Sequence, residues 1–125
     1  MDADTEVMCF VATARPDEAT AFYRDVLGLT LVEDSPFALV FQTGGRSLRV
    51  QKMAEVAPAA NTVLGWKVAD IQAESRALRG KGVTFARFDG LVQDNDGVWV
   101  SPAGHKVAWF QDPDGNTLSL TQFRD

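Results

Sequence analysis

The sequence predicts an α+β domain made of two similar halves, each with the order strand, helix and then further strands. Three observations support this prediction. Short apolar runs bounded by turn residues recur along the chain, as they do in proteins with several strands. A stretch with helix start and stop signals follows the first such run in each half. The segment 54–61, rich in Ala and Pro, separates the halves and is typical of a connector.

The first half begins with a short apolar strand, and a helix is then expected from Pro16 to the stop at Gly28. Asp17 and Glu18 suit the positive end of a helix. The buried stripe of this helix is expected at Ala19, Phe22, Val26 and Leu27. The expected strands of this half are 7–12, 29–33, 37–42 and 47–53, the last two forming a hairpin around Gly44 and Gly45.

The second half repeats this order. Asp70 is a good N-cap for a helix that Gly80 and Gly82 end. The apolar face of this helix is expected at Ile71, Ala77 and Leu78. The expected strands are 62–68, 83–88, 98–101, 106–111 and 117–122, with a strong turn signal at 112–116. Neither half would bury enough apolar surface alone, so we expect one domain over 1–125, with modules at about 6–53 and 62–123 that share a core.

Composition narrows the classes of partner. The net charge is -5 and the pI is about 4.7, and an acidic protein repels phosphate backbones, so we expect no nucleic-acid partner. The single cysteine, Cys9, excludes an intramolecular disulfide and a Cys-rich metal site. No apolar stretch approaches the ~18 residues of a membrane span, and the acidic residues 1–6 do not resemble a signal peptide. We therefore expect a cytoplasmic protein without membrane association.

Two motifs carry a resemblance to a known family. The segment 22–29, FYRDVLGL, resembles the first-helix motif of the vicinal oxygen chelate superfamily, which includes glyoxalases, bleomycin resistance proteins and extradiol dioxygenases. The segment 110–116, FQDPDGN, resembles the late turn of the same family. The resemblance implies two βαβββ modules whose sheets form one open, cup-shaped mixed sheet, with the helices outside and the ligand inside. Fold alone does not choose among the family's activities.

The resemblance also implies where a divalent metal would be held, because metal-dependent members place His, Glu or Gln on the strands that line the cup. The matching positions here are Met8, Thr62 or Val63, Gln51 (less well Arg49) and Ser119. Of these side chains only Gln51 is a plausible ligand, and one neutral amide does not hold a divalent cation. Met8 and the adjacent Cys9 are better explained as sulfur residues packed in a strand. We therefore expect no metal and no cofactor.

The same strands suggest which residues would contact an organic ligand. Period-2 alternation places Arg49 and Gln51 on one face of their strand, where Arg49 could bind a carboxylate or phosphate. Trp109 could stack against a planar ligand, although core or interface packing explains it equally well, and packing is favoured for Trp66. The expected ligand-binding residues are Arg49, Gln51, Trp109, Ser119 and Met8.

Catalytic groups are scarce in the sequence. His105 is the one candidate general base, but a His that follows Gly104 in a hairpin turn is more often simply exposed to solvent. Asp112 and Asp114 sit in a turn, where Asp side chains commonly cap their own backbone. The favoured function is therefore metal-free binding of a small organic molecule. The alternatives are a metal-dependent glyoxalase-like lyase or dioxygenase, and a metal-free isomerase or epimerase. We also expect a homodimer, because open sheets leave edges that need cover.

Overall fold

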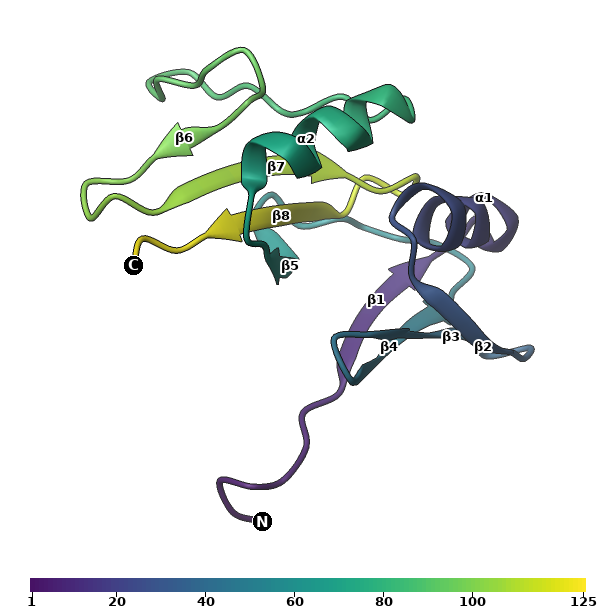
Figure 1. Ribbon diagram of the computed structural model, residues 1–125. Coiled ribbons are helices and arrows are strands. Elements are labelled where there is room, and N and C mark those ends of the chain that lie inside the picture. The colour runs from purple at the N-terminus through teal and green to yellow at the C-terminus, as the bar shows by residue number, and fades with distance from the viewer. The chain divides into compact units, whose positions relative to one another are not determined.

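The computed structural model describes residues 1–125 and divides into two compact units, Met1–Ala57 and Pro58–Asp125. The boundary falls inside the Ala- and Pro-rich segment 54–61. Each unit contains one four-stranded mixed sheet with a helical segment (Figure 1). The α+β class and the two βαβββ halves are therefore confirmed. None of the helices is long and apolar enough to cross a membrane.

The first unit has the strand order β1-β4-β3-β2. Its strands are β1 (Cys9–Thr13), β2 (Thr30–Asp34), β3 (Ala38–Thr43) and β4 (Arg46–Lys52). β1 runs parallel to β4, while β4, β3 and β2 form antiparallel pairs. The parallel pair follows from the connection: β1 leads into a helix, and the hairpin β3–β4 then returns the chain beside β1. β4 alternates as expected, with Leu48 and Val50 buried between more exposed neighbours.

The helical segment of the first unit differs from its prediction in which face is buried. It begins as α1 (Pro16–Thr20) and continues as the π-helical stretch η1 (Ala21–Val26). Tyr23 is fully buried and packs against Phe41 of β3, with 5.6 Å between ring centroids, whereas Phe22 is only half-buried. The predicted stripe is therefore only partly right: Ala19 is buried, Phe22, Val26 and Leu27 are half-buried, and the fully buried Tyr23 was missed. It assumed 3.6 residues per turn, whereas the Leu27 N–H donates to the carbonyl of Phe22 (2.9 Å), five residues back.

The second unit has the same topology, with the strand order β5-β8-β7-β6 and β5 parallel to β8. Its strands are β5 (Thr62–Lys67), β6 (Trp99–Val100), β7 (Lys106–Gln111) and β8 (Thr117–Gln122). β7 pairs antiparallel with both β6 and β8. Ala108, Phe110 and Leu118 form its buried centre, and the Phe110 ring lies 5.5 Å from that of Phe85.

The helix of the second unit, α2 (Ile71–Gly80), is capped as expected, because the carboxylate of Asp70 accepts from the N–H of Ala73 at 3.1 Å. Its buried residues are Ile71, Ser75 and Leu78. The predicted burial of Ala77 is wrong. Residues four and seven positions after Ile71 share its face at 100° per residue, whereas Ala77, six positions on, points away.

The predicted strand 83–88 is also wrong. Its backbone makes a single bond to the sheet, from the N–H of Ala86 to the carbonyl of Trp109 (2.8 Å). The short strand β6 pairs instead with Lys106 and Val107, so two separate pieces of chain share the outer edge of β7. Both pieces are apolar in sequence, and the sequence pattern alone does not reveal which of them is paired as a strand.

Three five-residue turns in the second unit repeat one hydrogen-bond pattern. They cover 94–98, 101–105 and 112–116. In each, the first N–H donates to the fifth carbonyl, the Gly in fourth place donates back to the first carbonyl, and the first side chain accepts from the fifth N–H. The Gly takes a positive φ each time, which favours glycine. The expected capping role of Asp112 is thus observed.

Candidate ligand-binding site

The open face of the first sheet, opposite its helix, carries the two polar residues expected there. Arg49 lies in register with Phe10 on one side and Val40 on the other, and Gln51 with Ala12 and Ala38. The Arg49 side chain is half-buried, and no ion pair in the structure involves it. A guanidinium without a carboxylate partner keeps its donors available for a ligand anion.

The second sheet presents an aromatic cluster on its open face, which we call the aromatic trio: Phe88, Trp99 and Trp109. The rings of Trp99 and Trp109 lie 6.0 Å apart at a shallow angle of 36°. Phe88 stands edge-on to Trp109, with 5.2 Å between centroids and an interplanar angle of 86°. Trp109 is in register with Ser119 of β8, which places the Ser119 hydroxyl on the same face.

A pocket of about 330 Å³ borders the aromatic trio at Phe88. Its wall includes the segment Pro58, Ala59 and Ala60, and two polar side chains, Gln111 and Thr117. Since Gln111 and Thr117 are in register with each other on β7 and β8, they face the pocket as a pair. The pocket therefore combines apolar walls with an amide and a hydroxyl, the composition typical of small-molecule sites.

Gly65 shows how closely the strands β5 and β8 approach each other on this open face. A Cβ added to Gly65 would lie 2.7 Å from the Oγ of Ser119, with which it is in register. The glycine thus leaves space that the Ser119 hydroxyl uses. Trp66, the next residue, is in register with Leu120 and so points to the opposite face, which agrees with the packing role expected for it.

The donor set for a divalent metal does not fit. Nowhere does the structure gather three or more His, Cys, Asp or Glu side chains around a common point. Met8 lies just before β1 and is 48% exposed, so it does not belong to the expected strand 7–12. Ser119 is buried on β8, and Gln51 lies on β4 of the other unit. A thioether, a hydroxyl and one amide are not the ligands that hard or borderline divalent cations require.

His105 is held in place by its own turn and by the C-terminal segment. Its Nδ1 accepts a hydrogen bond from the N–H of Arg124 at 3.0 Å, so a neutral His105 ring carries its proton on Nε2. The ring also packs edge-on against Phe123, with 5.2 Å between centroids. These contacts favour a packing role for a half-buried imidazole, and catalysis by His105 stays a prediction.

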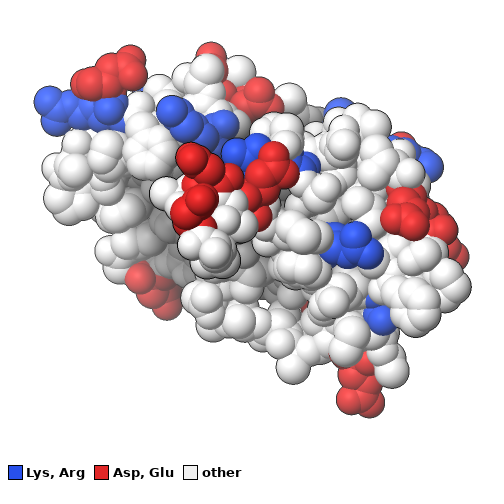
Figure 2. All heavy atoms as spheres, turned by 90° about the horizontal axis from the view of Figure 1, so that it is seen from below, with Lys and Arg blue, Asp and Glu red and all other residues white.

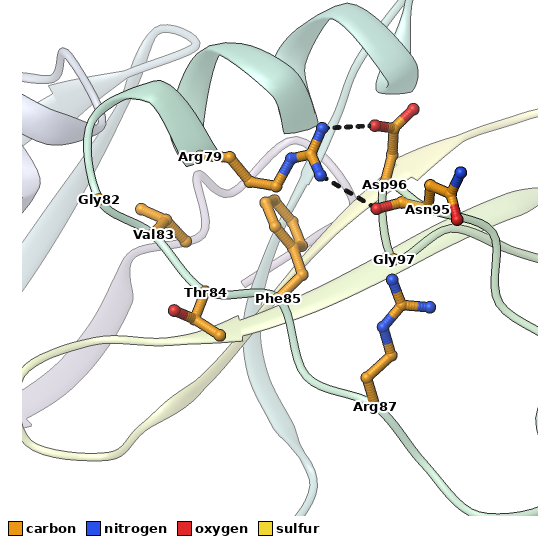
Figure 3. Close-up of a pocket in the computed structure, with 9 residues that line it drawn as sticks. All are labelled: Arg79, Gly82, Val83, Thr84, Phe85, Arg87, Asn95, Asp96 and Gly97. Carbon is orange, nitrogen blue, oxygen red and sulfur yellow. Dashed lines mark hydrogen bonds and ion pairs between the residues drawn. The ribbon is translucent and has the colours of Figure 1, made fainter.

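A second, shallower pocket of about 540 Å³ lies at the C-terminal end of α2 (Figure 3). Asp96 is its buried anchor: its carboxylate binds Arg79 at 2.8 Å and Arg76 at 3.2 Å. Arg79 also donates to the carbonyl of Asn95 (3.0 Å). The single Asp96 carboxylate balances only one of these two guanidinium charges. On the face shown in Figure 2, acidic side chains likewise lie beside basic ones. The ion pairs of Asp96 therefore connect α2 to the turn 94–98.

Asp94 organises that turn electrostatically. Partial burial acts to raise the pKa of its carboxyl, but the N–H donors of Val98 and Asp96, the Gln72 amide and the charge of Arg87 together outweigh burial. The pKa of Asp94 is consequently lowered from the ordinary value of 3.8. The charged form is the one that accepts from the N–H groups of Asp96 and Val98, each at 2.9 Å.

Sequence reasoning missed Phe88, Gln93 and Asp96. One signal was available for Asp96, since Asp-Asn-Asp-Gly at 94–97 resembles Asp-Pro-Asp-Gly at 112–115 and predicts the same turn. Phe88 was assigned to a strand that does not form, and no sequence pattern reveals that the Gln93 side chain bonds three backbone atoms.

Comparisons with known proteins agree with this architecture. Among solved structures, the chain resembles lactoylglutathione lyase from Agrobacterium tumefaciens, with a TM-score of 0.75 and 17% identity over 97% of this chain and 95% of that one. It also resembles a glyoxalase/bleomycin resistance protein/dioxygenase from Alicyclobacillus acidocaldarius (TM-score 0.70, 20% identity, 99% and 95% covered). A superfamily member from Sphaerobacter thermophilus gives a TM-score of 0.71 at 20% identity, covering 95% and 98%.

Identities this low show the fold alone. No curated protein matches the sequence. The model of one family does match, over residues 7–120, which is nearly the whole chain. The chain therefore belongs to the Glyoxalase/Bleomycin resistance protein/Dioxygenase superfamily.

Proposed function

We propose that this protein binds a flat small organic molecule on the open face of its second sheet without using a divalent metal. The observation that carries the proposal is the aromatic trio beside a pocket of about 330 Å³. Half-buried indole rings offer stacking surface, while the Gln111 amide and the Thr117 and Ser119 hydroxyls can orient polar substituents. Arg49 and Gln51 remain the proposed contacts for a ligand on the first sheet, and Met8 stays a prediction.

The metal-dependent alternative lacks support in the donor set described above, and nothing favours an isomerase beyond His105, whose Nδ1 already accepts a hydrogen bond. The proposal therefore includes a chemical expectation: protein incubated with Ni²⁺, Zn²⁺ or Mg²⁺ and then desalted retains far less than one equivalent. One equivalent of tightly held metal per chain would favour the lyase or dioxygenase reading instead.

Ligand binding is tested with naphthol, a planar probe, and decahydronaphthol, its saturated counterpart. We expect naphthol to raise the melting temperature of the protein and decahydronaphthol to do so much less. The substitution Trp109→Leu should weaken naphthol binding roughly tenfold. An aromatic contact contributes up to ~1.5 kcal/mol of binding free energy in addition to the burial of apolar area. Trp66→Leu is the matched control, because Trp66 lies on the other face. Equal loss in both variants, or no shift with either probe, would refute the site.

The proposed contact at Arg49 on the first sheet is tested separately with succinate, a carboxylate probe without a ring, and succinamide, its neutral counterpart. Arg49→Met should weaken succinate binding while leaving succinamide binding unaffected, because only the charged probe needs the guanidinium. An Arg49→Met protein that binds both of these probes as the parent does would remove Arg49 from the ligand contacts of the first sheet. The expected homodimer also stays a proposal, and light scattering at micromolar concentration decides it.

A further inference from the structure

One glutamine, Gln93, bonds the backbone at two of the three residues of the aromatic trio. The side chain of Gln93 accepts from the N–H of Phe88 at 2.8 Å and donates to the carbonyl of Ala86 at 2.9 Å. A third bond runs from its Nε2 to the carbonyl of Gly97 at 3.0 Å. The backbone of Gln93 meanwhile forms an isolated β-bridge with Trp99. Both flanking members of the trio are thus tied to the same residue.

These bonds use both donor hydrogens of the amide group and one of the two lone pairs of its oxygen. The two contacts to Ala86 and Phe88 imitate those that a neighbouring strand would make to alternate backbone groups. The segment 83–88 has only one backbone bond to β7, so the Gln93 side chain supplies pairing that a strand would otherwise supply. Figure 1 shows the long connection between α2 and β6 to which this segment belongs.

Few other bonds hold the backbone of Phe88, the nearest being from the guanidinium of Arg87 to the carbonyl of Gln93 at 3.3 Å. The loop after Phe88 contains the Leu91 N–H to Phe88 carbonyl bond of 3.2 Å, and Val92 at its tip is 89% exposed. Phe88 itself is 41% exposed, so burial alone does not determine where its ring lies. The edge-on contact with Trp109 therefore depends on the backbone position that the Gln93 amide sets.

We propose that Gln93 is the positioning residue of the ligand site: its amide holds Phe88 upright beside Trp109, and the resulting corner selects flat aromatic ligands over puckered ones. This inference rests on the proposed function for its ligand, but the ring geometry can be measured without one. A rigid aromatic corner binds a planar ring without first having to be ordered, and this lowers the entropic cost of binding.

The test compares Gln93→Met with Gln72→Met. Both substitutions replace a glutamine by a side chain of similar length, but the Gln72 amide bonds only Asp94 (3.0 Å) and leaves Phe88 untouched. In two-dimensional proton NMR, the nuclear Overhauser contact between the Phe88 and Trp109 rings should disappear in Gln93→Met and persist in Gln72→Met. The contact between Trp99 and Trp109 should survive in both, because β6 pairing holds Trp99.

Binding gives the second readout. Naphthol should bind Gln93→Met about three- to tenfold more weakly than it binds the parent protein. The affinity for decahydronaphthol, which is low already in the parent, should stay nearly constant. The preference for the flat probe should therefore shrink. A merely structural loss would lower both affinities together.

The outcomes separate the two proposals. If the parent protein binds neither probe, the proposed function fails, while loss of the Phe88–Trp109 contact in Gln93→Met still supports the positioning role of Gln93. If the parent binds naphthol but Gln93→Met keeps both the ring contact and the probe preference, the positioning role is wrong and the site survives. Loss of the ring contact in Gln72→Met as well would also overturn it.

Discussion

The two sheets share strand order and pairing directions, yet they differ in their open faces and outer edges. The first presents the unpaired Arg49, and its outer edge is a single strand, β2. The second presents an aromatic trio, and its outer edge is divided between β6 and the segment 83–88. Topology therefore follows from the order of connections, while the chemistry of each face depends on individual side chains. The two sheets should contribute similarly to stability through their buried cores, although their open faces differ. This part of the comparison can be tested most directly.

Phe41 and Phe110 occupy equivalent central positions, each fully buried and each paired with one other ring, Tyr23 and Phe85. Replacing either by Ala should lower the free energy of unfolding by ~3–5 kcal/mol, because a large buried ring leaves a cavity. Urea denaturation measures both. Phe37→Ala, at a site that is 78% exposed, should change it by less than ~0.5 kcal/mol. If either the Phe41 or the Phe110 variant unfolded with nearly the parent's free energy, the two cores would not be equivalent.

The outer edge of the second sheet should depend for its stability on the buried carboxylate of Asp96. The outer edge of the first sheet, β2, has no buried carboxylate and should not show this dependence. Asp96→Ala should cost ~2 kcal/mol, because it removes the charge-assisted hydrogen bonds that Arg76 and Arg79 make to a carboxylate only 7% exposed. Asp34→Ala, which removes the partner of Lys52 on β2, should cost less than ~1 kcal/mol, since Asp34 is 57% exposed. If urea denaturation gave similar losses of unfolding free energy for the Asp96 and Asp34 variants, the two outer edges would not differ in their dependence on a carboxylate.

The open face of the second sheet can be probed through Gly65. Gly65→Ala should destabilise the protein by ~1–2 kcal/mol, because the new methyl group would lie 2.7 Å from the Ser119 Oγ. Adding Ser119→Ala should recover most of this loss, and a double-mutant cycle measures the coupling between the sites. Independent effects at the two positions would contradict the close approach.

The smallest expected effect concerns Asp94. Because the pKa of Asp94 is lowered in the folded protein, its stabilisation is fully present above the ordinary value of 3.8 and is lost as the pH falls through the lower folded value. Asp94→Asn keeps a side-chain oxygen for the turn but removes this titration. The melting temperature of the variant should therefore fall less steeply on acidification below about pH 4 than that of the parent. Parallel curves would show that Asp94 does not contribute.

Several elements could be predicted because their causes are local. Asp70 caps its helix through a contact only three residues away, and the turn 112–116 is closed by its own Asp and Gly. The alternation of Leu48 and Val50 with Arg49 and Gln51 likewise needs only the period of a strand. Such features persist whatever surrounds them, and so the family and its βαβββ halves could be inferred from sequence.

Other features could not be predicted because they result from competition between distant segments. The widened turn that buries Tyr23 rather than Phe22 is decided by packing on Phe41 of β3. The segment 83–88 has the apolar composition of a strand, but β6 pairs with Lys106 and Val107 on the edge that it would use.

The sequence by itself determined the class of the fold, the order of its elements and the scarcity of metal ligands, since these depend on local pattern and residue type. The proximity of Trp99 and Trp109 follows from their hairpin, but only the tertiary structure decided that Phe88 joins them and that the Gln93 side chain bonds the backbone of Phe88 and Gly97. The physical reason is that a side-chain amide can bond whichever backbone groups the fold brings within about 3 Å, and no periodicity along the chain encodes that encounter.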